Sequence, residues 1–530
     1  MEFYPTEEYL WHPTDSSKNT LVRRCFGIEA FSAYMETRMD GFTHLTNSAA
    51  LTFPTFTPTR EVFEPQVRAA WTHLRHLIPQ IAARGVQFPE PGGGFGLKYN
   101  LPASLMGVDE WASETVFFSD DVNTLYERHV ELKDNCLWFP GDNHYVAEVH
   151  VSPMTTGWNI SLVISHNSID GRNAMSLLDL LVEALVGVID KTKGSIDTLK
   201  WGTEITRLVP PAALIKMIVE KGSIVDLAPP TIPPAGSAPP PGVIPWMYPP
   251  LETGKKGDIT RLTKLSKEAT AKLHQLTNEH GRTVTQVITA LSALAHIEAF
   301  LNIAGRKGNE RFKLVSEAYE ASNVYLVAFN FVNHRHKLPG GYHDFKSATG
   351  APLCAIDGMP IMAPAKNIKA LVKVDTNKKI GVCQVDEGLF WKAVEDIASG
   401  WKGADLSLDA WYQREIEKEI GAKFFDPSMF GIPAIIMSSI GDTDRLGLFK
   451  HVHPSSGNKT LIVEDIITGI RLRAPPPMNL LYQYDGQLQC HWMTGGEYNT
   501  AEEMELVTDI FEARLSEILR ITDAAKTIVA

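Results

Sequence analysis

The segment Ser165–Gly171, with the sequence Ser-His-Asn-Ser-Ile-Asp-Gly, places several chemically competent residue types in one short stretch. Of the 17 histidines in the chain, only His166 is followed four residues later by an aspartate, Asp170. The adjacent glycine makes a chance match rarer than the His–Asp pair alone. A neutral imidazole accepts a proton near pH 7, so His166 is a candidate general base toward a hydroxyl group.

Asp170 allows two interpretations. An aspartate four residues after the histidine does not easily reach the same ring if the turn is closed, so we expect Asp170 to lock the turn by pairing with an arginine or with backbone donors. In the alternative interpretation, Asp170 only caps the following helix and His166 is a buried histidine with its hydrogen bonds satisfied. The motif alone leaves both open.

The elements around this segment are expected to be a strand and a helix. Alternating polarity predicts strands over residues 145–151 and 158–165. Apolar residues spaced by three and four positions then predict a helix through residues 174–185. The strand therefore ends at the histidine, and the helix packs back against the sheet.

The second half of the chain mixes helices and strands in the same way. An apolar stripe over residues 262–276 predicts a helix that ends at Gly281, and Thr283 with Gln286 predicts a capping box that opens the next helix. Alternation over residues 481–493, around an Asp-Gly pair, predicts a hairpin. We therefore predict an α/β fold of two layers, with one mixed sheet covered by helices in each half.

The clearest boundary in the chain is rich in proline. Ten of the 33 prolines fall within residues 229–250, where they exclude a helix or an interior strand. We predict a first domain over residues 1–226, a linker over 227–255 and a second domain over 256–530, and we leave open a crossover of part of the second domain to the first sheet. A ligand for a proline-binding module is the alternative interpretation of this segment.

Composition excludes several classes of protein. The net charge of −12 argues against a nucleic-acid scaffold. The five cysteines are widely spaced and form no C-x-x-C pair, which favours a reducing compartment. The first residues lack a signal-peptide pattern, and the nearest approach to a membrane span, residues 284–303, is interrupted by polar residues. We expect a soluble cytoplasmic protein without a membrane partner.

The turn at residues 165–171 resembles the H-x-x-x-D-G signature of the chloramphenicol acetyltransferase-like superfamily. Three later segments are similar to its other elements: the helix pair at 266–300, the N-x-R strand at 332–339 and the S-[SN]-x-G strand at 437–441. The resemblance implies two acetyltransferase-like domains with an active-site tunnel at their interface.

Departures from the patterns of individual subfamilies narrow the choice of subfamily within the superfamily. The chain has no D-F-G-W-G, which disfavours a plant BAHD enzyme, and Ser165 stands where condensation domains usually have a second histidine. Length and the proline-rich segment are most similar to fungal trichothecene 15-O-acetyltransferases. The resemblance implies transfer of an acetyl group from acetyl-CoA to a hydroxyl of a hydrophobic secondary metabolite, a trichothecene-like sesquiterpenoid alcohol.

The resemblance also implies roles for individual residues. His166 would be the base, and Asp170 would be structural, with Gly171 supporting the turn. Arg335 is the first candidate partner of Asp170 and Arg172 the second. Two further residues, Ser438 and Ser439, are candidates for contact with the substrate or the oxyanion, although a plain strand end explains them equally well.

The predicted ligands are a small alcohol and acetyl-CoA as co-substrate, with no permanently bound cofactor and no nucleic acid. The histidine pairs at 334/336 and 451/453 lack a third ligand, so no metal is predicted. We expect a monomer. A condensation-type enzyme with a carrier-protein donor, and a binding protein of the same fold without catalysis, stay as alternatives.

Overall fold

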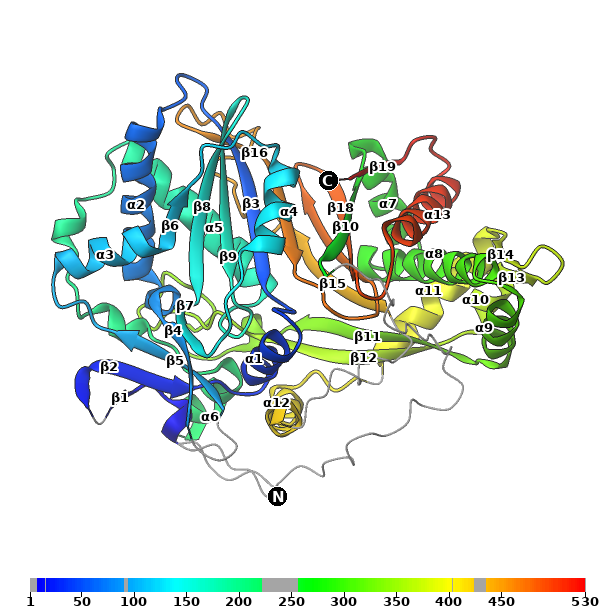
Figure 1. Ribbon diagram of the computed structural model, residues 1–530, viewed down its shortest axis with the longest axis horizontal. Coiled ribbons are helices and arrows are strands. Elements are labelled where there is room, and N and C mark those ends of the chain that lie inside the picture. The colour runs from blue at the N-terminus through cyan, green and yellow to red at the C-terminus, as the bar shows by residue number, and fades with distance from the viewer. Residues whose placement is uncertain are drawn as a thin grey trace.

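The computed structural model describes residues 7–14, 16–89, 94–221, 256–402, 404–423 and 435–529, which form two lobes side by side (Figure 1). Each lobe is built on a large mixed β-sheet that is covered by helices. The predicted α/β fold, with one such sheet in each half of the chain, is confirmed.

The central sheet of the first lobe has the strand order β16-β3-β9-β8-β6. Both of its predicted strands are confirmed, since β8 and β9 form an antiparallel pair and every residue of β9 is buried. The strands are β3 (Leu45–Thr52), β6 (Val116–Phe118), β8 (Ala147–Met154), β9 (Gly157–Ile164) and β16 (Ile462–Ile470).

The predicted helix after the turn is confirmed as α5 (Gly171–Ile189), which packs against the sheet and against α2 (Arg60–Leu77). The lobe also contains a second sheet and four more helices. These are β1 (His12–Thr14), β2 (Ser17–Arg24), β4 (Arg84–Gln87), β5 (Phe95–Asn100), β7 (Asp142–Tyr145), α1 (Ile28–Arg38), α3 (Leu105–Thr115), α4 (Leu125–Asn135) and α6 (Ala212–Lys221).

The sheet of the second lobe has the order β12-β11-β15-β17-β18-β10-β19. Its strands are β10 (Asp258–Leu265), β11 (Val324–Asn333), β12 (Ile356–Pro364), β15 (Ile435–Asp442), β17 (Met478–Tyr484), β18 (Gln487–Gly495) and β19 (Ala525–Ile528). The accompanying elements are α7 (Lys267–Glu279), α8 (Val284–Arg306), α9 (Asn309–Ala321), α10 (Lys366–Leu371), β13 (Val372–Asp375), β14 (Ile380–Cys383), α11 (Glu387–Lys402) and α13 (Ala501–Leu519). Helix α12 (Leu408–Lys423) comes from the second half of the chain but packs mainly on α1 and α6 of the first lobe.

Helix α8 forms the centre of this lobe's core. Within the described ranges it is the one helix long and apolar enough to cross a membrane, and 89% of its most apolar window is buried inside the fold. Its predicted capping box is confirmed, because the Thr283 side chain accepts from the Gln286 amide and the Gln286 side chain accepts from the Thr283 amide.

The helix predicted over residues 262–276 begins later in the structure than the sequence pattern indicated. Leu262 and Leu265 belong to strand β10 and not to the helix, because β10 is held between β18 and β19 by antiparallel pairing. The helix α7 begins only at Lys267.

The predicted hairpin is confirmed: β17 and β18 pair, and Asp485 and Gly486 both have positive φ angles (46° and 70°), as a tight hairpin turn requires.

A late segment of the chain joins the two lobes. Strand β16 lies in the first lobe's sheet, paired antiparallel with β3, although the segments before and after it along the chain, β15 and β17, belong to the second lobe (Figure 1). The predicted linker, residues 227–255, lies outside the described residues, as do residues 222–226 before it. The division of the chain at that point stays a prediction.

Candidate functional site

His166 lies in the turn between the end of β9 and the start of α5, where the two lobes meet. Its side chain is largely buried, with 7% of the residue exposed. Burial lowers the pKa of the ring from its ordinary value of 6.5, and this outweighs the opposing effects of its own backbone and of the Asp170 charge. The imidazole is therefore neutral near pH 7 and able to accept a proton.

The ring has no hydrogen bond from another residue in the part of the chain that the structure describes, and its Nδ1 atom is buried without such a partner. Catalytic bases in empty sites commonly lack a tight partner until substrate binds. The imidazole is thus held by its backbone and by packing, and not by a side-chain acceptor.

Asp170 is fully buried and uses both of its oxygens. Oδ1 accepts from the Asn173 amide at 2.9 Å, which caps α5. Oδ2 accepts from Arg335 Nη2 at 2.5 Å and from the Ala355 amide at 2.8 Å. The structure therefore shows Asp170 both as a helix cap and as the partner of an arginine from the second half of the chain.

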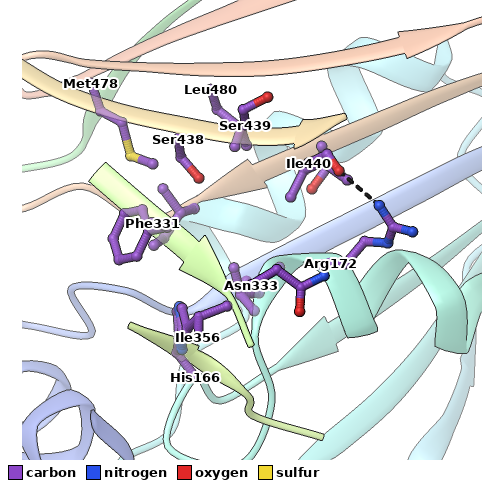
Figure 2. Close-up of a pocket in the computed structure, with 14 residues that line it drawn as sticks. His166, Arg172, Phe331, Asn333, Ile356, Ser438, Ser439, Ile440, Met478 and Leu480 are labelled. Atoms are coloured by element: carbon purple, nitrogen blue, oxygen red, sulfur yellow. Dashed lines mark hydrogen bonds between the residues drawn. The ribbon is translucent and has the colours of Figure 1, made fainter. Parts of the chain in front are cut away.

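Arg335 is oriented by a neighbouring amide. The Asn333 side-chain oxygen accepts from the Arg335 backbone at 3.0 Å and from its Nη1 at 2.9 Å. Asn333, Arg335 and Asp170 thus form one chain of hydrogen bonds behind the turn. Arg172, the second candidate partner of Asp170, instead donates to the Ile440 carbonyl at 3.0 Å (Figure 2).

The front of the turn is held by a residue that the sequence did not point to. Glu36, in α1, accepts from the His166 amide at 2.6 Å through Oε1, and its Oε2 lies 2.5 Å from Ser165 Oγ. Glu36 is fully buried. No sequence spacing signals this contact, since 130 residues separate Glu36 from His166.

A cavity of about 650 Å³, part of it open to solvent, extends from His166 between the lobes (Figure 2). Its walls come from β3, α5, β11, β12, β15, β16 and β17. Polar groups of the second lobe lie on one side: Figure 2 shows the Ser438 hydroxyl on the side of β15 that faces Phe331, while Ser439 points away from it. The lining residues are Leu45, His166, Gly171, Arg172, Phe331, Asn333, Ile356, Ser438, Ser439, Ile440, Thr468, Ile470, Met478 and Leu480.

Arg172 brings a positive charge to this cavity. Burial, and secondly the charge of Arg335, lowers the pKa of Arg172 to about 10, so the side chain stays charged at neutral pH. A cation at this position favours negative charge that develops on a bound molecule.

A second cavity, of about 480 Å³, reaches His166 from the side of α1. Its lining is almost wholly apolar, and the side chains other than His166 contribute only two hydroxyl groups. The lining residues are Ile28, Phe31, Ser32, Met35, Phe42, Thr43, His166, Phe329, Phe331, Ile436, Ile470, Leu472 and Met478.

The two cavities share four lining residues, which are His166, Phe331, Ile470 and Met478. Of these four, only His166 carries a group that takes up and releases protons. The arrangement can therefore bring two different molecules, one from each side, to a single imidazole.

A third cavity, of about 760 Å³, lies on the far side of Ser439, which lines both it and the first cavity. Its walls include His274, Arg282 and Arg445, together with the first turn of α8. Arg282 is ion-paired with Glu395, and Arg445 is ion-paired with Asp442, which also lines this cavity. The start of α8 is closed by its capping box, so the walls are polar and of mixed charge. A cavity with polar walls of mixed charge thus adjoins the first cavity at Ser439.

The histidine pair 334/336 does not form a metal site. His334 is fully buried and stacks on Trp411 with ring centroids 4.6 Å apart, while His336 is exposed just beyond the end of β11. Across the described ranges, no three His, Cys, Asp or Glu side chains are grouped to hold a metal ion.

Comparisons with known proteins place the fold. No family model matches the sequence, and no curated protein matches it. Among solved structures, the TRI3 trichothecene 15-O-acetyltransferase from Fusarium sporotrichioides superposes with a TM-score of 0.69 at 14% identity, over 94% of this chain and 97% of that one. The chain has the two-domain fold of these acetyltransferases and of condensation domains.

Two further structures share this fold. The first condensation domain of the calcium-dependent antibiotic synthetase matches with a TM-score of 0.54 at 13% identity, over 96% of this chain and 98% of that one. F. sporotrichioides TRI101, complexed with coenzyme A and T-2, matches with a TM-score of 0.52 at 10% identity, over 94% and 98%. The resemblance in fold extends over nearly the whole chain in each case.

Within this fold the structure brings most of the predicted site residues together. Four of them line the first cavity, namely His166, Gly171, Ser438 and Ser439. Asp170 and Arg335 lie behind the turn and are joined to each other. Glu36 was not predicted, and Arg172 lies on the cavity wall and not against Asp170 as a hydrogen-bond partner.

Proposed function

We propose that the chain is an O-acyltransferase that moves an acetyl group from acetyl-CoA to a hydroxyl of a small hydrophobic metabolite, of the type of a trichothecene-like sesquiterpenoid alcohol. The observation that carries this proposal is the meeting of two cavities at His166. A reaction between a thioester and an alcohol needs both molecules at one base, and His166 is the one shared residue able to act as a base.

The polar route suits the donor. Coenzyme A has a phosphorylated nucleotide end, which we assign to the third cavity. There Arg282 and Arg445 would contact phosphate groups in place of their carboxylate partners Glu395 and Asp442. A long arm separates that end from the thioester. The arm would pass Ser439 and enter the first cavity, where the thioester meets His166.

The apolar cavity suits the acceptor. Walls formed by Phe31, Met35, Phe42 and Phe329 bury a hydrocarbon skeleton and offer nothing to a charged one. An alcohol bound there would present its hydroxyl to His166 at the junction of the cavities.

The proposed chemistry is direct transfer. The His166 ring removes the hydroxyl proton while the alcohol oxygen attacks the thioester carbonyl carbon, so the new C–O bond forms as the proton leaves. The C–S bond of the tetrahedral intermediate then breaks, and the imidazolium returns the proton to the departing thiolate. The enclosed site limits hydrolysis of the donor by water.

Other residues would support this chemistry. Asp170 and Arg335 hold the turn, and Gly171 keeps it close to β15, since a Cβ atom at that position would lie 3.1 Å from Ile440 Cδ1. Ser438 lines the first cavity and would donate to the oxyanion of the intermediate, with Ser439 as the neighbouring candidate. A preorganised donor there lowers the barrier where negative charge develops.

The named activities of the similar structures support the proposal. One is a trichothecene 15-O-acetyltransferase, and another is complexed with coenzyme A. We extend the acetyl group, the CoA donor and the sesquiterpenoid type of acceptor to this chain on that basis.

The test is release of free thiol from acetyl-CoA by the purified chain, with a panel of hydrophobic alcohols that includes sesquiterpenoids, and with product identification by mass spectrometry. We expect thiol release that depends on an alcohol and is lost in His166→Ala. Release only from an acyl group on a pantetheinylated carrier protein would replace the proposal with a condensation-type reaction. No release with either donor, together with tight binding of an alcohol, would indicate a non-catalytic binding protein.

A further inference from the structure

The buried carboxyl of Glu36 has surroundings unlike those of the other carboxyl at the turn. No lysine or arginine lies within ion-pair distance of it in the described ranges, whereas Asp170 is paired with Arg335. Its partners are hydroxyl and amide groups: the His166 amide, Ser165 Oγ, the Asn167 amide and, at 3.5 Å, Thr43 Oγ1. A buried carboxylate without a cation is costly in free energy unless the group takes up a proton.

The hydrogen count at Ser165 points to a protonated Glu36. Ser165 Oγ lies 2.5 Å from Glu36 Oε2 and 2.8 Å from Asn167 Oδ1, but the hydroxyl has only one hydrogen to donate. If Glu36 carries a proton on Oε2, it donates to Ser165 Oγ, and Ser165 in turn donates to Asn167. Oε1 then accepts from the His166 amide, so both Glu36 oxygens and the Ser165 hydroxyl have partners.

We propose that Glu36 is a positioning residue that works as an uncharged acid: it holds the turn of His166 from the α1 side, as donor to Ser165 and acceptor from the His166 amide. This inference deepens the function proposed above and rests on it for its catalytic consequence. The same helix lines the apolar cavity with Phe31, Ser32 and Met35. Glu36 therefore fixes the base relative to the wall against which the acceptor would bind.

The electrostatic environment agrees with this geometry. Burial raises the pKa of Glu36 to about 8 against the opposing hydrogen bonds from Ser165, His166, Asn167 and Thr43. The titratable groups around it do not supply a positive charge at neutral pH. His166 has a lowered pKa, and the buried Cys25 thiol has a raised one, partly because of Glu36 itself.

A neutral carboxylic acid resembles a primary amide in having an acceptor oxygen on one side and a donor on the other, which makes Glu36→Gln the decisive variant. An amide oxygen in place of Oε1 accepts from His166, and an amide nitrogen in place of Oε2 donates to Ser165. We expect Glu36→Gln to keep kcat within about threefold of the parent. Glu36→Leu loses both contacts, and we expect its kcat to fall about 10–100-fold with a smaller change in KM, because the base is misplaced.

Stability against pH gives a readout that does not need activity. Glutamate titrates at about 4.3 in an unfolded chain, and at about 8 at this site in the folded chain. Between these values the folded state binds the additional proton, so the free energy of unfolding falls as the pH rises. Glu36→Gln removes this titration, and its Tm relative to the parent should therefore rise from about pH 5 to about pH 8 and then level off.

Glu29 is the matched control, since it lies on the same helix and is also buried, but it is joined to Arg23 by contacts of 2.6 and 2.9 Å. Glu29→Gln should lower Tm across the same pH range, because it leaves a buried arginine unpaired. Equal loss of kcat in Glu36→Gln and Glu36→Leu would overturn the uncharged acid, and so would a Tm difference for Glu36→Gln that does not change with pH. Full kcat in Glu36→Leu would overturn the positioning role. If the parent itself releases no thiol, the proposed function fails, and the pH series still decides the state of Glu36.

Discussion

The two sides of His166 are built in different ways. Toward the second lobe, the turn is held by a charged pair between Asp170 and Arg335, and the cavity beyond it has mixed walls in which Arg172 and Ser438 add polar groups to an apolar lining. Toward α1, the turn is held by Glu36 through hydrogen bonds alone, and the cavity beyond it is apolar.

This difference shows how one turn can serve two ligands of opposite character. A buried charged pair needs further hydrogen bonds to offset the loss of hydration, and Asn333 and the Ala355 amide of the second lobe supply them. An apolar cavity is better bordered by groups without net charge, because an ion beside it would cost free energy or draw in water. The four predictions below test this contrast.

The largest loss of activity is expected for a substitution of His166, which lies between the two sides. His166→Ala should lower kcat about 10²–10⁴-fold, since general-base catalysis contributes that much. The variant should remain folded with a Tm close to that of the parent, because the ring makes no hydrogen bond to another described residue. Circular dichroism and thiol release on the same preparation measure both quantities, and most of the activity surviving would remove His166 from the mechanism.

The next effect tests the charged side. Asp170→Asn should lower the free energy of unfolding by about 3 kcal/mol, because it leaves buried Arg335 without its counter-charge. Activity should fall about 100-fold with it, since the turn shifts. Chemical denaturation and steady-state kinetics give the two numbers. Arg335→Met is the control: alone it should also destabilise, and combined with Asp170→Asn it should add little, whereas strict additivity would mean that the pair does not act as a unit.

A smaller effect separates the two serines of the polar wall. Ser438 faces the space in front of Phe331, so Ser438→Ala should lower kcat about tenfold with little change in KM if it donates to the oxyanion. Ser439→Ala is the matched control on the other face of β15, and we expect it to change KM for the donor more than kcat. The reverse pattern would exchange the two roles.

The smallest expected effect is the change of kcat/KM with pH. The base must be neutral, and burial lowers the pKa of His166 below its ordinary 6.5, so kcat/KM should be level at neutral pH, with the midpoint of its acid limb below pH 6.5. It should fall up to about tenfold per pH unit only at lower pH, as the imidazolium forms. A pH–rate profile checks this, and an acid limb with its midpoint above 7 would show that a charge beside the ring outweighs its burial.

Much of the fold followed from local pattern. Alternation identified β8 and β9, the apolar repeat identified α5, and the capping box at Thr283 identified the start of α8. The start of α7 was misplaced because Leu262 and Leu265 fit a helical repeat as well as a strand, and only the neighbouring strands β18 and β19 select the strand.

The same division applies to the site. His166 and Asp170 lie within one turn of the chain, so their spacing was visible in the sequence, and Arg335 was reached through a family resemblance. The contact of Asp170 with Arg335 spans 165 residues, and that of Glu36 with His166 spans 130. No local pattern encodes contacts of that length.

Residue types and short-range spacing were thus sufficient to mark an imidazole on a strand-to-helix turn, because those features depend on neighbours along the chain. The meeting of a cavity with mixed walls and an apolar cavity at that imidazole depends on how the lobes pack, with β16 crossing from one to the other. Burial then set the pKa values of His166 and Glu36, since desolvation exists only once distant segments enclose a side chain.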